Sequence, residues 1–168
     1  MRHAGPVTDA TALCLAYLID PDGAGGPRVL LGRKRQGFGT GKVVGLGGHV
    51  EAGETSAAAA VRETYEESGL TVAPRDLRTA GRVAFRFPAN PAWDMAVDLF
   101  VVTQWTGSVV ASPELDPEWR PVADLPWAQM WDDARIWLPH VLRGERVTAD
   151  ITYDDAGARV ARADLRVG

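Results

Sequence analysis

Residues Gly48 to Leu70 read GHVEAGETSAAAAVRETYEESGL, a loop bounded by glycines and followed by a segment with strong helical preference. Thr55 is a suitable N-cap for a helix, and the alanines that follow it favour helix propagation. Gly69 suits the left-handed position just beyond the last helical turn. The stretch therefore predicts a loop, a helix and a sharp exit.

The second half of this helix concentrates acidic side chains. Glu63 and Glu67 are i,i+4 neighbours with Glu66 between them, so we expect three carboxylates on one face within a turn of about 5.4 Å. Like charges at this spacing repel, and the helix macrodipole disfavours negative charge at the C-terminal end. A divalent cation would turn the repulsion into attraction, because Mg²⁺ binds carboxylates together with substrate phosphates. The pattern therefore predicts a metal site.

The spacing of these residues resembles the Nudix box. All the fixed positions of that motif are met, by Gly48, Glu54, Arg62, Glu63, Glu66, Glu67, Gly69 and Leu70. Thr64 is a mild departure, since an apolar residue is usual there. The alternative is an exposed helix carrying an Arg62–Glu66 ion pair, which explains one pair but neither the surplus of glutamates nor the glycine spacing.

Phosphoanhydride hydrolysis is the chemistry that the resemblance implies, with Glu63, Glu66 and Glu67 as metal ligands. It adds a backbone carbonyl near Gly47 or Gly48 to the metal shell. One of the glutamates would also accept the proton of the attacking water, but coupled carboxylates titrate as a group, so the sequence does not single out which.

Arg62 is the candidate for orienting these glutamates through charge-assisted hydrogen bonds. Glu54 either shares that work or is an ordinary acidic residue near a helix N-terminus. A further metal ligand is expected from outside the helix. Glu118, directly before Trp119, resembles the position that some MutT-like enzymes use; Glu114 and Asp116 are rivals, and a solvated acidic loop is the alternative.

A second resemblance concerns the substrate. The segments LLGRKRQGFGTGK, from Leu30 to Lys42, and MWDDARIWLP, from Met130 to Pro139, are similar to the oxidised-purine nucleoside triphosphatases of the MutT-homologue type. The hairpin-like C-terminus adds to this similarity. The resemblance implies a nucleobase pocket made of Lys34, Phe38, Val44, Phe85, Met95, Trp131 and Asp133.

Two of these side chains have a clear chemical use, and two positions depart from the related enzymes. Trp131 offers a face for stacking, although a plain core tryptophan is the alternative, and Asp133 can hydrogen-bond a purine edge. Val44 and Ala134 stand where the related enzymes have an asparagine and a second aspartate. Each missing partner is worth on the order of 1–3 kcal/mol of discrimination when buried, so an altered base preference is an open alternative.

Composition bounds the remaining classes. The 168 residues are 46% hydrophobic, which suits one domain over residues 1–168 with a loose tail over 1–9. A net charge of −4 disfavours duplex nucleic acid as a partner. The single cysteine, Cys14, favours a reducing compartment, and no stretch is long and apolar enough for a membrane span or a signal peptide. We expect a cytoplasmic monomer or small homo-oligomer.

The element pattern is that of an α+β protein. A second helix is expected from near Asp132 to Gly144. Strands are expected at Thr11–Ile19, Arg28–Arg33, Lys42–Leu46, Arg78–Phe87, Met95–Trp105, from Glu118, at Val147–Tyr153 and at Arg159–Val167. The Nudix resemblance implies an α/β/α sandwich, with a mixed sheet between helices and a loop–helix–loop motif.

The function that this resemblance implies is a pyrophosphohydrolase dependent on Mg²⁺, or alternatively Mn²⁺. It would split nucleoside triphosphates into monophosphate and pyrophosphate, favour oxidised purines such as 8-oxo-dGTP, and so protect DNA from damaged precursors. Two alternatives stay open: hydrolysis of another nucleoside diphosphate derivative, such as ADP-ribose or a dinucleoside polyphosphate, and a non-catalytic module that senses a nucleotide.

Overall fold

The structure, a computed structural model, describes residues 10–168, in which nine strands build one mixed sheet with two α-helices. The tail expected over residues 1–9 lies outside this range. The strands are β1 (Thr11–Asp20), β2 (Arg28–Lys34), β3 (Val43–Val44), β4 (Leu46–His49), β5 (Arg78–Arg86), β6 (Met95–Val102), β7 (Leu115–Pro121), β8 (Val147–Tyr153) and β9 (Val160–Val167). The helices are α1 (Ser56–Ser68) and α2 (Ala134–Leu142), with short 3₁₀ turns at Pro74–Asp76, Pro91–Trp93 and Trp127–Gln129.

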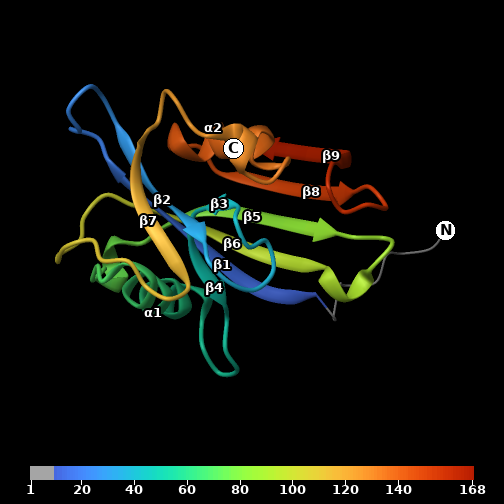
Figure 1. The fold of residues 1–168 in the computed structure, drawn as a ribbon, viewed down its shortest axis with the longest axis horizontal. Helices are drawn as coiled ribbons and strands as arrows, with labels where there is room; N and C mark the ends of the chain where they lie inside the picture. The colour runs from blue at the N-terminus through green and yellow to red at the C-terminus, as the bar shows by residue number, and fades with distance from the viewer. Residues whose placement is uncertain (1–9) are drawn as a thin grey trace.

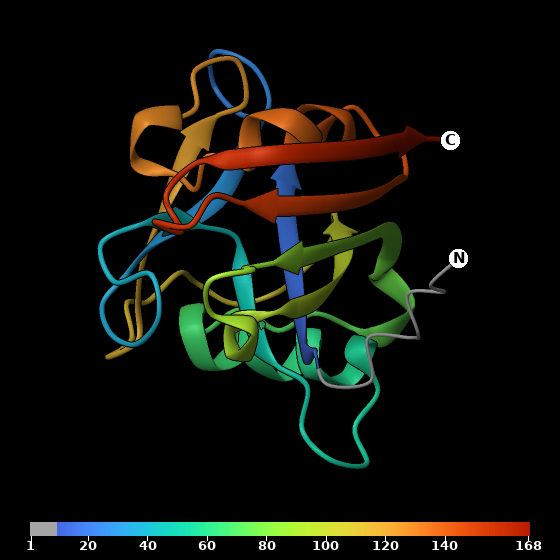
Figure 2. The same cartoon turned by 90° about the vertical axis from the view of Figure 1, so that its right-hand side faces the viewer.

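The sheet runs in the order β3-β2-β1-β6-β5-β8-β9, with β4 paired to β1 and β7 paired to β2. The pairs β1–β6 and β5–β8 are parallel and all the other named pairs are antiparallel. Figure 1 and Figure 2 both show α1 on one side of the sheet and α2 on the other. This arrangement confirms the predicted α/β/α sandwich.

The alternation of side chains along β1 divides the core into two layers. Cys14 and Leu18 point to the layer that contains Ala60 of α1. Tyr17 points to the opposite layer, where its ring lies edge-on to Trp137 of α2 at 6.1 Å. Because successive residues of a strand face opposite sides, one buried strand anchors both helices.

Helix α1 begins and ends as its local sequence predicts. The Thr55 hydroxyl accepts a hydrogen bond from the Ala58 N–H at 3.1 Å, which satisfies one free donor of the first turn. Gly69 adopts φ +77° and its N–H donates to the carbonyl of Tyr65 at 2.8 Å. The two caps fix where the acidic end of the helix lies relative to the sheet.

Three strand boundaries differ from the sequence prediction. The strand expected over Lys42–Leu46 is two short strands, because Gly45 separates β3, which pairs with β2, from β4, which pairs with β1. Strand β6 ends at Val102, short of the expected Trp105. Strand β7 begins at Leu115 rather than at Glu118, because it pairs with β2 along its whole length.

Strand β7 extends farther toward the N-terminus than the strand expected from Glu118, and its prolines account for the difference. Pro117 and Pro121 both lie within this strand, where they lack the N–H that a central strand needs. Among the described strands, β7 pairs with β2 alone, so it is an edge strand, in which proline is tolerated.

Among the described residues, neither α-helix is long and apolar enough to cross a bilayer.

Candidate active site

A cavity of about 370 Å³ extends from Glu67 on α1 to Trp131, just before α2. Its wall includes β1, β3 and β4, the ends of β5 and β6, and the loop after β2. All seven residues predicted for the nucleobase pocket line it: Lys34, Phe38, Val44, Phe85, Met95, Trp131 and Asp133. Residues from six separate segments of the chain thus face one space.

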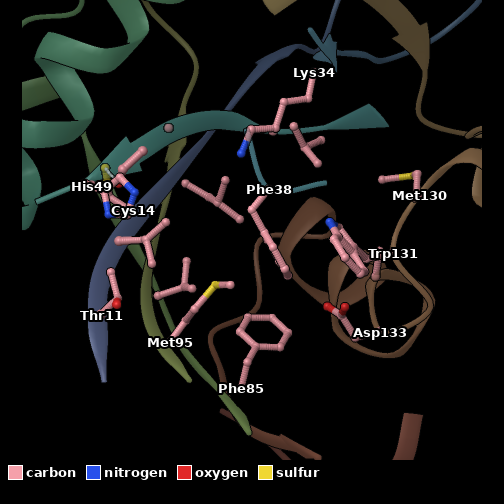
Figure 3. A pocket seen from close by; sticks show the side chains of 18 of the residues that line it. Thr11, Cys14, Lys34, Phe38, His49, Phe85, Met95, Met130, Trp131 and Asp133 are labelled. Carbon is pink, nitrogen blue, oxygen red and sulfur yellow. Dashed lines mark hydrogen bonds between the residues drawn. The ribbon is translucent and has the colours of Figure 1, made fainter. Parts of the chain in front are cut away.

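Figure 3 shows how these side chains are arranged. Phe38, Trp131 and Asp133 lie on one side of the cavity, and Cys14 and His49 lie across from them. Cys14 pairs with Gly48 and His49 follows it on β4, next to the Gly47 N–H that bonds Glu67. The cavity therefore has an aromatic end and an end next to the glutamates.

At the aromatic end, Phe38 stacks on Trp131 with ring centroids 5.3 Å apart and an interplanar angle of 15°. The Lys42 ammonium lies 5.3 Å from the centroid of the same Trp131 ring, a cation–π contact. A side chain at Gly39, which has φ +80°, would approach Trp131 to 3.0 Å. Glycine at this position therefore lets the loop after β2 lie close to the tryptophan.

Asp133 is buried at this end, with 3% of its surface exposed. The Tyr153 hydroxyl donates to Oδ1, and the Trp137 indole Nε1–H donates to Oδ2 at 2.7 Å. Burial raises the pKa of this carboxyl, and the two hydrogen bonds oppose the rise. Asp133 thus has both oxygens engaged by fixed donors while it lines the cavity.

Five aromatic residues that the sequence analysis did not select also line the cavity: Tyr17, Phe87, Trp93, Trp137 and Tyr153. Phe87 stacks on Tyr153 at 5.0 Å, and Trp93 lies 5.2 Å from Phe38. The alternation along Val147–Tyr153 could have placed Tyr153 on the buried face. Phe87 and Trp93 flank a proline-rich connection that gave no such signal.

At the other end, Glu63, Glu67 and Glu114 each offer a carboxylate oxygen, and these oxygens all lie within 4.8 Å of one another. Glu63 and Glu67 are 8% and 7% exposed, whereas Glu114 is exposed. Glu66 lies outside this group, because at 3.6 residues per turn it points about 100° away from Glu67. Of the three helical glutamates predicted as metal ligands, Glu63 and Glu67 belong to this group, and the role of Glu66 stays a prediction.

Glu114, rather than Glu118, is the carboxylate from outside the helix that lies with Glu63 and Glu67. The Arg35 N–H donates to the Glu114 carbonyl at 2.9 Å, which holds the residue just before β7 beside the end of β2. Glu118, farther along the edge strand, pairs with Arg120 at 3.2 Å instead. Asp116, the other rival, lies 3.8 Å from Arg35. Glu118 was preferred for its resemblance to a position in MutT-like enzymes, and the contacts of this structure favour its rival Glu114.

Glu67 is held next to the strand that precedes the loop. The Gly47 N–H donates to Glu67 Oε1 at 2.7 Å. Burial nevertheless raises the pKa of Glu67 to about 8, and the nearby Glu63 and Glu114 add to the rise. A side chain at Gly48 would come within 2.6 Å of the Glu63 carboxyl carbon, so this glycine leaves room for the glutamate.

Arg62 joins the loop to the acidic helix. Its guanidinium donates to both oxygens of Glu54, at 2.8 and 2.9 Å, and to the His49 carbonyl at 3.0 Å. The same group donates to Glu63 at 2.9 Å and to Glu66 at 3.1 Å. The bonds from Arg62, with one from the Glu51 N–H, lower the pKa of Glu54 to about 2. The geometry thus gives Arg62 and Glu54 the orienting contacts expected of them.

Comparison with known proteins identifies the family. The model of the NUDIX domain matches residues 10–141, which is most of the chain. The chain belongs to the Nudix family. It is 42% identical to the oxidized purine nucleoside triphosphate hydrolase of Danio rerio over 134 residues, which cover 80% of this chain and 81% of that protein. The Mus musculus protein of the same name is 37% identical over 128 residues, which cover 76% of this chain and 80% of that protein.

Solved structures of Nudix proteins share the fold. A MutT protein from Bacillus halodurans superposes with a TM-score of 0.78 over 92% of this chain and 97% of that one, at 23% identity. A MutT Nudix hydrolase from Burkholderia pseudomallei gives a TM-score of 0.60 at 21% identity, over 70% and 87% of the two chains. The predicted Nudix fold is confirmed by these matches.

Proposed function

We propose that this Nudix protein is a metal-dependent pyrophosphohydrolase that splits nucleoside triphosphates into a monophosphate and pyrophosphate. Its favoured substrates are oxidised purine nucleotides such as 8-oxo-dGTP, so its role is to clear damaged DNA precursors from the nucleotide pool. The names of the Danio rerio and Mus musculus relatives, which share most of this chain's length, support this assignment.

One observation carries the proposal: a single cavity is lined by Glu67 at one end and by Trp131 and Asp133 at the other. A nucleoside triphosphate has the same polarity, with a flat purine at one end and anionic phosphates at the other. In the proposed pose the base lies at the aromatic end and the phosphates lie beside the glutamates. Lys34 lines the space between and carries a positive charge that acts on Glu67.

The carboxylates suit a hard divalent cation. Three oxygens from Glu63, Glu67 and Glu114 lie within 4.8 Å of one another, and oxygen donors are the ligands that Mg²⁺ prefers. Two of these groups are buried, and burial raises the pKa of both, so a bound cation would favour their ionised forms. When bound there, a divalent cation neutralises phosphate charge and makes a nearby water more acidic.

The protein's own residues do the remaining work. Gly47 and Gly48 bring the strand backbone against the carboxylates, and the Gly47 N–H orients Glu67. Arg62 orients the Glu63 carboxylate through a hydrogen bond. It also donates a hydrogen bond to Glu66, a further acidic group on the same helix. The coupled carboxylates accept the proton of the attacking water as a group.

The base end favours a purine by stacking and by shape. Trp131 supplies the largest flat surface, and base–aromatic stacking is worth about 1–3 kcal/mol per base. Val44, Phe85 and Met95 supply apolar walls. Asp133 supplies hydrogen-bond acceptors, and Ala134 adds no polar group beside it.

The identity of the metal, the compartment and the assembly state belong to the same proposal. Mg²⁺ is the proposed cation, with Mn²⁺ as a substitute, because both take carboxylate ligands. A net charge of −4 and a single buried cysteine favour a cytoplasmic protein that does not bind duplex nucleic acid. It would act as a monomer or small homo-oligomer.

A nucleotide panel tests the proposal. The protein is incubated with Mg²⁺ and 8-oxo-dGTP, dGTP, dATP, ADP-ribose or a dinucleoside polyphosphate, and kcat/KM is measured for each. We expect 8-oxo-dGTP to be the best substrate. Faster turnover of ADP-ribose would contradict the sanitising role but keep the hydrolase. Tight nucleotide binding without any turnover would instead favour a sensing module.

A further inference from the structure

Tyr153 makes a contact with Asp133 that the proposed function does not use. The hydroxyl oxygen of Tyr153 accepts a hydrogen bond from the backbone N–H of Asp133 at 3.2 Å. The same hydroxyl donates to Oδ1 of the Asp133 side chain. Tyr153 has a single hydroxyl hydrogen, and the bond to Oδ1 uses it.

The second oxygen of Asp133 is held by a group that can only donate. An indole N–H has no lone pair to offer, so Oδ2, at 2.7 Å from Trp137 Nε1, is an acceptor in this contact. With Tyr153 donating to Oδ1, both oxygens act as acceptors. A carboxylate has about four acceptor positions, which leaves two for a ligand and no donor.

We propose that Tyr153 is a positioning residue that holds Asp133 as an acceptor-only group and so selects guanine-type over adenine-type bases. This inference rests on the proposed function, because it assumes that a purine occupies the aromatic end. Guanine and 8-oxoguanine present adjacent donors, the N1–H and the 2-amino group, on the Watson–Crick edge. Adenine presents a 6-amino donor beside N1, whose lone pair would face the carboxylate.

The surroundings of Asp133 explain why the tyrosine matters. Asp133 is 3% exposed, and burial alone favours the neutral acid. Hydrogen bonds donated to the carboxylate favour its ionised form. Without the Tyr153 hydroxyl, Oδ1 loses its donor and can take up a proton, and a neutral carboxyl group can donate to N1 of adenine. Ala134 offers no side-chain group that could replace the lost contact.

Tyr153→Phe is the variant that tests the inference, because it removes the hydroxyl and keeps the ring that stacks on Phe87 at 5.0 Å. Tyr65→Phe is the control. Tyr65 lies on α1, is exposed and is not among the residues that line the cavity. Both variants lose one tyrosine hydroxyl and keep the ring.

The measurement is binding of 8-oxo-dGMP and of 8-oxo-dAMP by calorimetry, without metal, alongside the melting temperature. Binding does not depend on hydrolysis, so the inference and the proposed function can fail separately. We expect the wild type to bind the guanine nucleotide more tightly. In Tyr153→Phe the preference for it should fall about fivefold to tenfold, the size expected for one ordinary hydrogen bond lost, and in Tyr65→Phe it should change less than twofold.

Turnover supplies the second readout. With 8-oxo-dGTP, Tyr153→Phe should raise KM by a similar factor and leave kcat within about twofold, because Asp133 is remote from the glutamates. An unchanged base preference in Tyr153→Phe, with only a lower melting temperature, would overturn the inference. So would a wild type that binds both nucleotides equally. Selective binding without turnover would support the inference and contradict the proposed function.

Discussion

The guanidinium of Arg62 donates hydrogen bonds to both carboxylate oxygens of Glu54, at 2.8 and 2.9 Å, across the loop that precedes α1. The same guanidinium reaches Glu63 at 2.9 Å. A planar guanidinium can make parallel bonds that the single ammonium of lysine cannot. This link fixes the loop to the carboxylate that faces the proposed metal.

Replacing Arg62 by lysine should therefore impair catalysis without removing the positive charge. We expect Arg62→Lys to lower kcat by about tenfold to a hundredfold, because the partners of metal ligands affect activity on that scale. Arg82→Lys is the control, since the exposed Arg82 bonds Asp98 alone, at 2.8 Å. Equal kcat values in the two variants would show that the guanidinium geometry is irrelevant.

Replacing Glu114 and replacing Glu118 should have different effects on metal affinity. Glu114 lies in the group with Glu63 and Glu67, whereas Glu118 pairs with Arg120. We expect Glu114→Gln to weaken Mn²⁺ or Mg²⁺ binding at least about tenfold, and Glu118→Gln to leave it within about twofold. Calorimetric titration of both variants checks this. The reverse order of the two affinities would restore Glu118 as the ligand.

The raised pKa of Glu67 predicts how pH affects the metal-free protein. The pKa is about 8 in the folded state against 4.5 for an ordinary glutamate. The folded state therefore binds the proton more tightly, so the stabilisation is complete below about pH 4.5 and is lost as the pH rises through about 8. The loss is on the order of a few kcal/mol.

Glu67→Gln isolates this effect, because glutamine keeps an oxygen for the Gly47 N–H and does not ionise. Between pH 5 and 8.5 the metal-free wild type should lose on the order of 5 °C in melting temperature relative to the variant. Saturating Mg²⁺ should restore the wild type and have little effect on Glu67→Gln. If the melting temperatures of the wild type and of Glu67→Gln changed equally with pH, the pKa of Glu67 would not be raised in the metal-free protein.

Trp131 should matter for substrate binding more than for folding. Trp131→Ala removes the stacking surface, so KM for 8-oxo-dGTP should rise about fivefold to a hundredfold with a smaller change in kcat. Trp105→Ala is the control, since Trp105 packs on Trp119 at 5.4 Å in the core layer of α1. If Trp131→Ala left base selectivity intact and lowered the melting temperature, Trp131 would be a core residue.

Local signals in the sequence account for what could be predicted of α1. Its cap at Thr55 and its exit at Gly69 depend on residues within one turn, so residue type is enough to place them. The nucleobase residues came from resemblance, and their arrangement around one cavity depends on the sheet order. Strand order is a property of distant pairings, which residue types alone do not specify.

The metal ligand from outside the helix shows the same limit. Glu114 lies beside Glu63 because the Arg35 N–H bonds its carbonyl and β7 pairs with β2 from Leu115 onward. Both contacts join segments far apart in the chain. Prolines are tolerated in β7 because it lies at the sheet edge, which residue types alone do not show. The Tyr153–Asp133 contact likewise depends on where β8 meets the start of α2.

The central claim is that Glu67 and its neighbours direct cleavage of a triphosphate between its inner phosphates. Phosphorus NMR of a mixture of the protein, Mg²⁺ and 8-oxo-dGTP tests it most directly. The account predicts that monophosphate and pyrophosphate appear in equal amounts, and that Glu67→Gln slows the reaction on the order of a thousandfold while remaining folded. Release of orthophosphate and a diphosphate, or undiminished turnover by Glu67→Gln, would contradict it.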